Sequence, residues 1–356
     1  MSALLRRGVE FAARFGMQVP VFLAPMAIVG KPELSIAVAN GGGAGACGVL
    51  TMQPEAILAW SRAVRARTNG AFQLNNWIPD PPPERHPANE ARLRAFLAAF
   101  GPEPPPLSGE AALPDFAAQC EAMIEAGPAI ISSVMGLFPP HIVGAIKRRG
   151  IVWFAAISTV AEAKAAEAAG AEAVVAQGAE AGGHRASFSA DLGERQMVGL
   201  ASLVPAVADA VQVPVIAAGG IADGRGVAAA LALGASGVQV GTGFLRAPEA
   251  AIHPVWRDAL GRSAPEDTVV TRVFSGRPGR FIDSDYVRAA TGPGAPSPAP
   301  YPLQRQLTAP MRAAAQDAGD LQRMQAFAGQ SAALARQKSA TEIVGDLWSG
   351  AEALLG

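Results

Sequence analysis

The chain has 356 residues, half of them hydrophobic, and its 29 Lys and Arg nearly balance its 30 Asp and Glu, leaving a formal net charge of -1. A nearly neutral chain with 5 Trp and 2 Tyr offers neither the basic surface nor the aromatic platforms of a nucleic-acid binder, so we expect no such partner. No apolar run reaches the roughly 18 residues of a membrane span, so we expect a soluble, unprocessed protein without a membrane partner.

Short apolar runs alternate with alanine-rich segments of helical spacing as far as residue 242. The predicted strands cover residues 19–25, 44–50, 72–77, 129–134, 151–157, 171–177, 213–219 and 236–242. Helical segments fall between them, as at 159–171 and 224–235, where a glycine near the end marks the helix stop. This alternation predicts parallel strands joined by crossover helices.

Eight such units match the length of a closed (β/α)8 barrel, whose active site lies at the carboxyl ends of the strands. We therefore predict an α/β protein with a TIM barrel. An open, doubly wound sheet is the alternative. No G-x-G-x-x-G directly follows the first predicted strand, where a dinucleotide fold would carry its fingerprint, so the barrel is favoured.

Two regions depart from this alternation of strands and helices. A proline-rich insertion at 78–110 follows the third strand and resembles an active-site loop. Residues 262–356 contain "TRVFSGRPGRFI" at 271–282 and then a Pro/Gly-rich stretch, and they show helical patterns from there to the end. We predict a barrel of residues 1–261 that carries the insertion, and a helical accessory segment, 262–356, that folds over the barrel mouth as a lid.

Glycines follow each of the last two predicted strands. Gly219 and Gly220 stand in "PVIAAGGIADGRG", and Gly241, Thr242 and Gly243 stand in "GVQVGTGFL". Barrels often hold a phosphate at this pair of loops, because backbone N–H groups can approach an anion where no Cβ intervenes. The two loops together predict a ligand that bears a phosphate, such as a mononucleotide, a flavin mononucleotide or a sugar phosphate.

The other strand ends carry amides and backbone groups rather than charges. The first strand ends in Ala24, Pro25 and Met26, the third in Asn75 and the sixth in Gln177. Carboxamide groups suit the donor and acceptor edge of an isoalloxazine ring, which favours a flavin. The alternative is that Asn75 and Gln177 cap the backbone at their own strand ends.

Several stretches resemble the nitronate monooxygenase family, formerly called 2-nitropropane dioxygenases. They are "PVFLAPMA", "AVANGGGAGACG", "FQLNNW", "AEAVVAQGAEAGGHR", "PVIAAGGIADGRGVAAALALGASGVQVGTGFL" and "FAGQSAALAR", and they cover most of the chain. Flavin-dependent enoyl-acyl-carrier reductases and some NADH:quinone reductases are similar in the same places. The family consists of FMN-dependent barrels in which a nitronate gives an electron to FMN, and oxygen then reacts to yield a carbonyl compound and nitrite.

The resemblance implies a set of flavin contacts at strand ends and loops. Carried over by position, they fall on Ala24, Pro25, Met26, Asn75, Gln177, Gly182, Gly220, Gln239, Val240, Gly241, Thr242 and Gln330. Gly219, Gly220, Gly241 and Gly243 would bind the flavin phosphate. We add Gly183, because two adjacent glycines let the chain come close to a ligand.

One departure from the family concerns a histidine. Many members carry it in an S-x-H-x-G stretch after the fourth strand, where it is often regarded as a catalytic base. Here the stretch reads "ISSVMGLF", so that Val134 occupies the position, and His141 lies seven residues further on in a predicted helix. A substrate that arrives deprotonated does not need this base, whereas we expect neutral nitroalkanes to be poor substrates.

The predicted catalytic residue is His184, in "QGAEAGGHRASF". It follows the sixth strand, so it opens onto the same mouth as the phosphate loops, and an imidazole can charge near neutral pH. We expect it to contact the substrate anion or to transfer a proton. We expect His86, His253 and Arg185 to be solvated, and Tyr301 either to reach the pocket or to pack within the lid.

The two cysteines, Cys47 and Cys120, lie far apart without a nearby metal-ligand pattern. Such sparse usage fits a reducing compartment, so we expect a cytoplasmic protein with no metal site. Cys47 stands among glycines after the second strand, and we expect it to be a buried apolar residue.

The predicted function is therefore FMN-dependent oxidation of an alkyl nitronate or a related carbanion, with O2 as the acceptor. Two alternatives stay open. One is an FMN-dependent NAD(P)H reductase of an enoyl thioester or a quinone. The other, motivated by Val134, is a flavin-binding barrel that has lost its activity. The expected partners are a small-molecule substrate and O2, and a homo-oligomer is an open alternative to a monomer.

Overall fold

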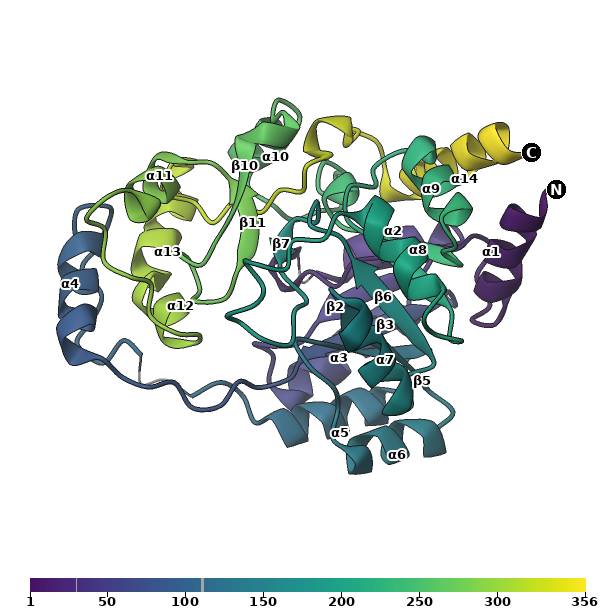
Figure 1. The fold of residues 1–356 in the computed structure, drawn as a ribbon, viewed down its shortest axis with the longest axis horizontal. Coiled ribbons are helices and arrows are strands. Elements are labelled where there is room, and N and C mark those ends of the chain that lie inside the picture. The colour runs from purple at the N-terminus through teal and green to yellow at the C-terminus, as the bar shows by residue number, and fades with distance from the viewer. Residues whose placement is uncertain (30, 110–111) are drawn as a thin grey trace.

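The computed structural model describes residues 1–29, 31–109 and 112–356, and Figure 1 shows its parallel strands among helices, to the right of α4 and α12. The strand order is β1-β9-β8-β6-β5-β4-β3-β2. The strands are β1 (Val21–Leu23), β2 (Gly45–Gly48), β3 (Phe72–Trp77), β4 (Ile130–Val134), β5 (Val152–Ile157), β6 (Ala173–Gln177), β8 (Val215–Ala218) and β9 (Gly237–Val240). A parallel bridge between Phe22 and Ala44 joins β1 to β2. The ring is thus closed, and the predicted TIM barrel is confirmed.

Every barrel strand lies within its predicted range, because each apolar run supplies a strand that is buried on both faces. The crossover helices surround the ring as α2 (Pro32–Asn40), α3 (Pro54–Arg65), α5 (Phe116–Ala126), α6 (Pro140–Arg148), α7 (Val160–Ala168), α8 (Leu200–Ala208) and α9 (Gly224–Ala232). Gly170 and Gly234 follow α7 and α9 with φ of 95° and 113°, a conformation that suits glycine and stops the helix as predicted.

The amino-terminal end of the barrel is closed by helix α1 (Ala3–Ala13). Its Phe11 ring lies 6.0 Å from the ring centroid of Phe22 on β1 and 6.3 Å from that of Phe154 on β5. These aromatic side chains belong to an apolar cluster inside the barrel. Since this end is plugged, any ligand must enter at the carboxyl ends of the strands.

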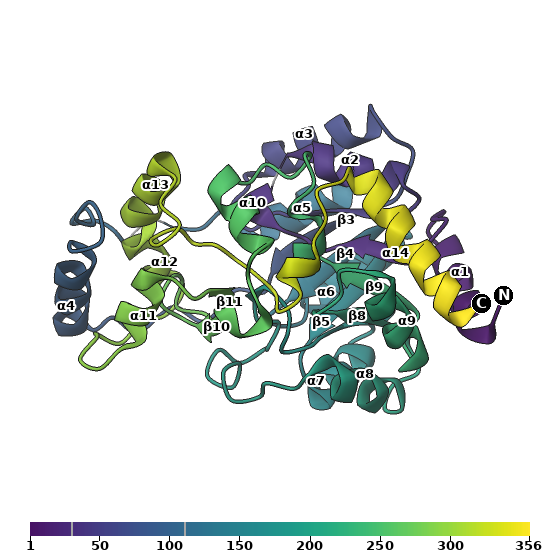
Figure 2. The same cartoon turned by 90° about the horizontal axis from the view of Figure 1, so that it is seen from above.

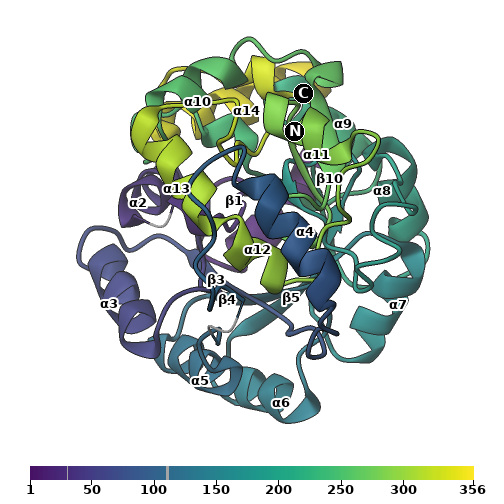
Figure 3. The ribbon, with the colours of Figure 1, turned by 90° about the vertical axis from the view of Figure 1, so that its left-hand side faces the viewer.

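A separate substructure covers that other end, and we call it the cap. It contains α4 (Pro87–Leu97) from the proline-rich insertion, together with β10 (Thr268–Thr271), β11 (Gly279–Ile282), α11 (Asp285–Thr291), α12 (Leu303–Leu307) and α13 (Ala309–Ala318). Leu93 and Leu97 of α4 share an apolar cluster with Leu303 and Leu307 of α12. Figure 3 shows α12 and α4 lying across the centre of the strand ring.

The cap is not purely helical, in contrast to the prediction for this segment. Strand β11 pairs antiparallel with β10 and with β7 (Gly183–His184), a two-residue strand in the loop after β6. This small sheet ties a barrel loop to the cap. Helix α10 (Pro254–Leu260) precedes it in the chain.

The last helix, α14 (Ala340–Leu355), lies beside the barrel rather than over its mouth (Figure 2). It packs against α9 and α2 with an apolar face that includes Ile343, Val344 and Leu347. It therefore takes the place of the eighth barrel helix. Only the earlier part of residues 262–356 covers the mouth. No helix in the described ranges is both long and apolar enough to cross a membrane.

Candidate functional site

A cavity of about 250 Å³ opens at the carboxyl ends of the barrel strands, beneath the cap. It brings together most of the residues that the sequence nominated for the site. They are Ala24, Pro25, Met26, Asn75, Gln177, Gly182, Gly183, His184, Gln239, Gly241 and Thr242. We call this space the mouth cavity.

Five nominated cofactor residues lie close to this cavity but do not line it: Gly219, Gly220, Val240, Gly243 and Gln330. The side chain of Val240 is buried within β9, with 1% of it exposed. The backbone N–H of Gln330 donates to the carbonyl oxygen of Glu180 at 2.9 Å. The hydroxyl of Ser331 donates to the carbonyl oxygen of Gly220 at 2.6 Å, so Gln330 contacts the loop after β6 and Ser331 contacts the glycine loop after β8.

The glycine loop after β8 has backbone geometry that other residues would not adopt easily. Gly219 and Gly220 have φ of 109° and 70°, in the left-handed region. Among the residues that the structure places, no hydrogen-bond acceptor is found for the backbone N–H groups of Gly220, Thr242 and Gly243. Since backbone donors are rarely left unpaired, these N–H groups are available to an anion between the two loops.

A row of amide side chains crosses the floor of the mouth cavity. The Nε2 of Gln73 donates to the Oε1 of Gln239 at 3.1 Å, and the Nδ2 of Asn75 donates to the Oγ of Ser132 at 2.9 Å. That hydroxyl in turn donates to the Oε1 of Gln73 at 3.2 Å. Within the described chain, the Oδ1 of Asn75 and the Nε2 of Gln239 have no protein partner, which leaves one acceptor and one donor for a ligand.

Gln177, by contrast, has both ends of its amide bonded to the loop that carries the histidine. Its Nε2 donates to the carbonyl oxygen of His184 at 3.0 Å, and its Oε1 accepts from the backbone N–H of Ala186 at 2.8 Å and from Arg185 Nη1 at 3.1 Å. Arg185 was expected to be a solvated cation, but 1% of it is exposed. Burial lowers its pKa to about 10. Its guanidinium is buried because it donates hydrogen bonds to this loop, including one to the carbonyl oxygen of Gly178 at 2.6 Å.

His184 lies in the wall of the mouth cavity among aromatic rings. Its ring centroid is 4.8 Å from that of Trp77 and 5.4 Å from that of Phe327. Its Nε2 lies 2.8 Å from the Oγ of Ser275. The Ser275 hydroxyl can donate either to this nitrogen or to the carbonyl oxygen of Arg277 at 3.1 Å. It therefore accommodates both neutral tautomers, and the other ring nitrogen is a donor in one tautomer and an acceptor in the other.

The surroundings of His184 oppose a positive charge on the ring. Burial lowers its pKa to about 3, and the guanidinium groups of Arg305, Arg277 and Arg312 act in the same direction. The expectation that this histidine charges near neutral pH is therefore wrong for the protein without ligand. A neutral imidazole can still donate or accept a hydrogen bond toward a substrate.

The other histidines lie outside the mouth cavity. His86 is exposed, as predicted, and His141 is exposed on α6. His253 is half-buried, and its Nδ1 accepts from the backbone N–H of Val255 at 3.2 Å as the cap of α10, so its side chain is only partly solvated. Val134 lines the mouth cavity at the end of β4, where the resembling family often has a histidine.

The roof of the mouth cavity contains residues that sequence reasoning missed. Arg305, Arg312, Gln325 and Phe327 come from the cap and line this space. The sequence signal for the site was the end of a strand, and none of these residues follows a barrel strand. Met135 was missed too. Its φ of 64°, a strained backbone value directly after Val134, is a property of the structure that the sequence does not show.

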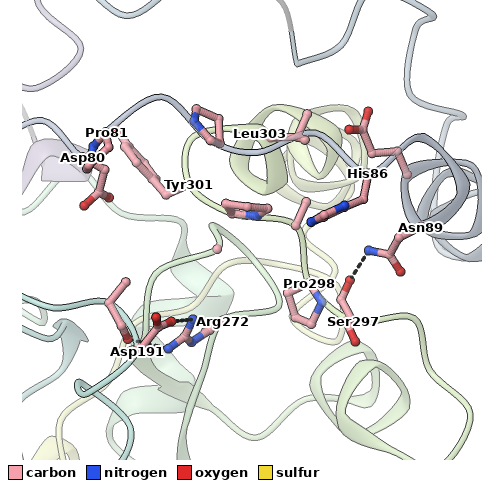
Figure 4. A pocket seen from close by; sticks show the side chains of 16 residues that line it. Asp80, Pro81, His86, Asn89, Asp191, Arg272, Ser297, Pro298, Tyr301 and Leu303 are labelled. Carbon is pink, nitrogen blue, oxygen red and sulfur yellow. Dashed lines mark hydrogen bonds and ion pairs between the residues drawn. The ribbon is translucent and has the colours of Figure 1, made fainter.

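A second cavity of about 500 Å³ lies between residues 80–90 of the proline-rich insertion and residues 272–303 (Figure 4). Its lining includes an ion pair between Asp191 and Arg272, with Nη1 and Oδ1 3.3 Å apart. Tyr301 lines it and packs against Trp77 of the mouth cavity, with 5.2 Å between ring centroids. Tyr301 is buried, and desolvation raises its pKa to about 12. The second cavity is larger but contains none of the nominated site residues, so the mouth cavity is the candidate site.

Neither cysteine belongs to the mouth cavity. Cys47 and Cys120 are both buried as free thiols, which confirms the prediction for Cys47. Burial raises the pKa of each thiol to about 12, so neither is a reactive thiolate at neutral pH. Within the described ranges, no group of three or more His, Cys, Asp or Glu is placed to hold a metal ion.

Comparison with known proteins agrees with this geometry. A nitronate monooxygenase from Paraburkholderia phytofirmans is 37% identical over 338 residues, which cover 93% of this chain and 92% of that protein. The crystal structure of a nitroalkane oxidase from Streptomyces ansochromogenes is 33% identical, with a TM-score of 0.86 over 98% of this chain and 100% of that chain. The structure of FabK from Thermotoga maritima is 27% identical, with a TM-score of 0.75 over 97% and 96% of the two chains.

The family model described as nitronate monooxygenase matches residues 10–350, nearly the whole chain. The match spans the barrel, the proline-rich insertion and the cap together. With the curated relative covering more than nine-tenths of both sequences, the chain belongs to the nitronate monooxygenase family.

Proposed function

We propose that this protein binds FMN and oxidises alkyl nitronates with O2 to a carbonyl compound and nitrite. Family membership supports the reaction, because similar proteins are named for nitronates and for nitroalkanes. The observation that carries the proposal is the mouth cavity itself. There the glycine loop after β9, the amide row and His184 meet at the carboxyl ends of the barrel strands.

The residues present fit an FMN molecule at both of its ends. The unpaired N–H groups of Gly220, Thr242 and Gly243 would hold the phosphate without a side chain in the way. The free Oδ1 of Asn75 and the free Nε2 of Gln239 would meet the hydrogen-bonding edge of the ring. When bound, FMN supplies the electron acceptor for the substrate and the place where O2 is reduced.

The remaining nominated cofactor residues have supporting roles in this proposal. Ala24, Pro25 and Met26 form one wall after β1, and Gly182 and Gly183 form another after β6. A Cβ on Gly182 would stand 2.5 Å from the backbone nitrogen of Gly329, so only glycine fits between these loops. Val240 and Gln330 would act through the backbone that they hold in place.

His184 is the proposed catalytic residue in its neutral form. A substrate oxygen at the free ring nitrogen would receive a hydrogen bond from one tautomer, in which the Ser275 hydroxyl would donate to Nε2. The aromatic rings around the imidazole exclude water on that side. Because Val134 offers no base, the proposal requires a substrate that has already lost its carbon-bound proton.

The test begins with the visible absorption spectrum of the purified protein and the identity of any flavin released from it. The protein is then mixed without oxygen with an alkyl nitronate and, separately, with NADH. Rapid loss of flavin absorbance with the nitronate is expected. Faster loss with NADH would favour the reductase alternative, and loss with neither would favour a barrel that binds flavin without turnover.

A further inference from the structure

Two positive side chains in the roof of the mouth cavity have no carboxylate partner. Arg305 and Arg312 both line the cavity, and within the described part of the chain neither forms an ion pair. No Asp or Glu is found among the described residues that line this cavity. An enclosed space with positive charge and no negative charge favours an anionic occupant.

The short helix α12 aims Arg305 at the barrel. Leu303 and Leu307 stand four residues apart, on one face of the helix, and both are buried in the apolar cluster of the cap. Arg305 lies midway between them and therefore projects from the opposite face. Since α12 lies across the strand ring, this face looks into the mouth cavity (Figure 3).

Arg312 is held more firmly than Arg305. Its Nε donates to the Oγ1 of Thr308 at 3.2 Å, its Nη1 to the Oε1 of Gln325 at 3.1 Å, and its Nη2 to the carbonyl oxygen of Arg305 at 2.8 Å. The last bond fixes the backbone from which the Arg305 side chain extends. No hydrogen bond to the Arg305 guanidinium is found among the residues that the structure describes, so its donors are available to a ligand.

We propose that Arg305, positioned by Arg312, is the specificity-determining residue that selects an anionic substrate, the nitronate rather than its neutral parent nitroalkane. The planar guanidinium presents two parallel N–H donors, which match the two oxygens of a nitronate group. A neutral nitro group has the same two oxygens but carries no net charge, so it gains less from this contact. The inference rests on the proposed function and adds the residue that recognises the charge.

The binding test uses inorganic nitrate, a planar anion with the same oxygen spacing as a nitronate. Isothermal titration calorimetry is carried out on the purified holoenzyme and on three variants. Arg305→Gln is expected to weaken nitrate binding about tenfold to a hundredfold, the range for a lost hydrogen bond to a charged group. Arg305→Lys keeps the charge but not the fork, so an intermediate affinity is expected.

The matched control is Arg92→Gln, which removes one positive charge from an exposed position on cap helix α4. Its nitrate affinity is expected to equal that of the wild type. Equal nitrate affinity in Arg305→Gln and the wild type would overturn the proposal, as would the absence of saturable nitrate binding to the wild type. Equal loss of nitrate affinity in Arg305→Gln and Arg92→Gln would also contradict the proposal, because the weaker binding would then come from the change in net charge.

Kinetics separate this inference from the proposed function. Arg305→Gln is expected to raise KM for the nitronate more than it lowers kcat, and to reduce the preference for nitronate over nitroalkane. If no nitronate reduced the flavin of the wild type while Arg305 still controlled nitrate binding, the proposed reaction would fail and the anion-selecting role of Arg305 would stand. An unchanged preference in Arg305→Gln would remove Arg305 from substrate selection.

Discussion

The Nε2 of His184 lies 2.8 Å from the Oγ of Ser275, although the two residues are 91 positions apart in the chain. Pairing between β7 and β11 carries the loop after β6 up to the cap and so makes this contact possible. The position of His184 therefore depends on both the barrel and the cap. The ionisation of its ring can be measured through the stability of the folded protein.

The first prediction concerns pH. The pKa of His184 in the folded protein is lowered to about 3 from an ordinary 6.5, so the unfolded chain takes up the proton first as the pH falls. The stability that this group contributes is complete above pH 6.5 and is lost as the pH falls toward 3. Between pH 7.5 and pH 5 we expect a loss of about 2 kcal/mol from this residue. Urea unfolding at both pH values measures it.

His184→Asn is the comparison for that experiment, because it removes the titrating group. The free energy of unfolding of His184→Asn should fall less between pH 7.5 and pH 5 than that of the wild type. If the free energy of unfolding fell equally between pH 7.5 and pH 5 in both proteins, the surroundings of His184 would not be holding its ring neutral.

The second prediction concerns turnover. His184→Asn keeps a side chain that can form hydrogen bonds but loses the imidazole, so we expect retained flavin and a kcat/KM for nitronates lowered about tenfold to a hundredfold. His141→Asn, at an exposed position on α6, is the matched control and should behave like the wild type. Steady-state oxygen consumption measures both. Unchanged kinetics in His184→Asn would remove this residue from the mechanism.

The barrel part of the site could be predicted from the sequence because a strand end fixes where a residue lies. Asn75 and Gln177 each belong to an apolar run, and the prediction that the run is a strand also predicted that these side chains lie at the mouth. Gln239, by contrast, was nominated only by the family resemblance. The cap offered no such rule. Arg305 and Arg312 stand on short helices whose position depends on packing against α4, a contact between segments about 200 residues apart.

The ionisation of His184 could not be predicted for the same reason. The sequence shows a polar loop, but the aromatic rings of Trp77 and Phe327 and the guanidinium groups that surround the imidazole come from distant segments. The burial of Arg185 could not be predicted either. It stands next to His184 in a polar stretch, yet it is buried because its guanidinium bonds the loop after β6 from within.

The third prediction concerns the flavin. Gly241 has φ of -109°, which a side chain tolerates, and a Cβ there would lie 3.3 Å from the Cβ of Ala24 and 3.6 Å from the Sδ of Met26. Gly241→Val should therefore fold but fill the space beside the phosphate loop. We expect most of the bound flavin to be lost, as measured by the ratio of flavin to protein absorbance. Gly345→Val, at an exposed helix position with no neighbour within 4 Å, is the control. A Gly241→Val protein fully loaded with FMN would contradict this placement.

The fourth prediction concerns the attachment of the cap. Asp80 in the insertion accepts from Arg277, whose Nε is 2.9 Å from Oδ2, and the Arg277 side chain is 2% exposed. Asp80→Asn would leave this guanidinium buried without a counter-charge. We expect the free energy of unfolding to fall by about 2 kcal/mol, below the cost for a fully buried pair because Asp80 is partly exposed. Hydrogen exchange should rise at residues 78–90 and 272–282.

The control for the cap is Glu33→Gln, which breaks the exposed pair between Glu33 and Arg67. Surface pairs contribute little, so this change should cost less than about 1 kcal/mol. Equal losses in the Glu33 and Asp80 variants would mean that the buried pair does not hold the insertion against the cap.

The fifth prediction concerns Val134→His, which introduces a base at the position where the family often has a histidine. Val134 lines the mouth cavity at the end of β4, and its backbone is held by a hydrogen bond from the N–H of Ile78 to its carbonyl oxygen at 3.0 Å. Val134→His would place an imidazole in a space already made positive by Arg305 and Arg312. These charges favour its neutral form, which is the form that can accept a proton from a carbon acid.

We expect Val134→His to raise kcat/KM for neutral nitroalkanes by about tenfold or more, while activity on nitronates changes little, because only the former must lose a proton in the site. Initial rates are measured below the pKa of the nitroalkane, where almost no nitronate forms in solution. Val134→Asn supplies a polar side chain without a base and is the matched control. If both variants oxidise nitroalkanes at the same rate, proton abstraction at position 134 does not limit that reaction, and the prediction fails.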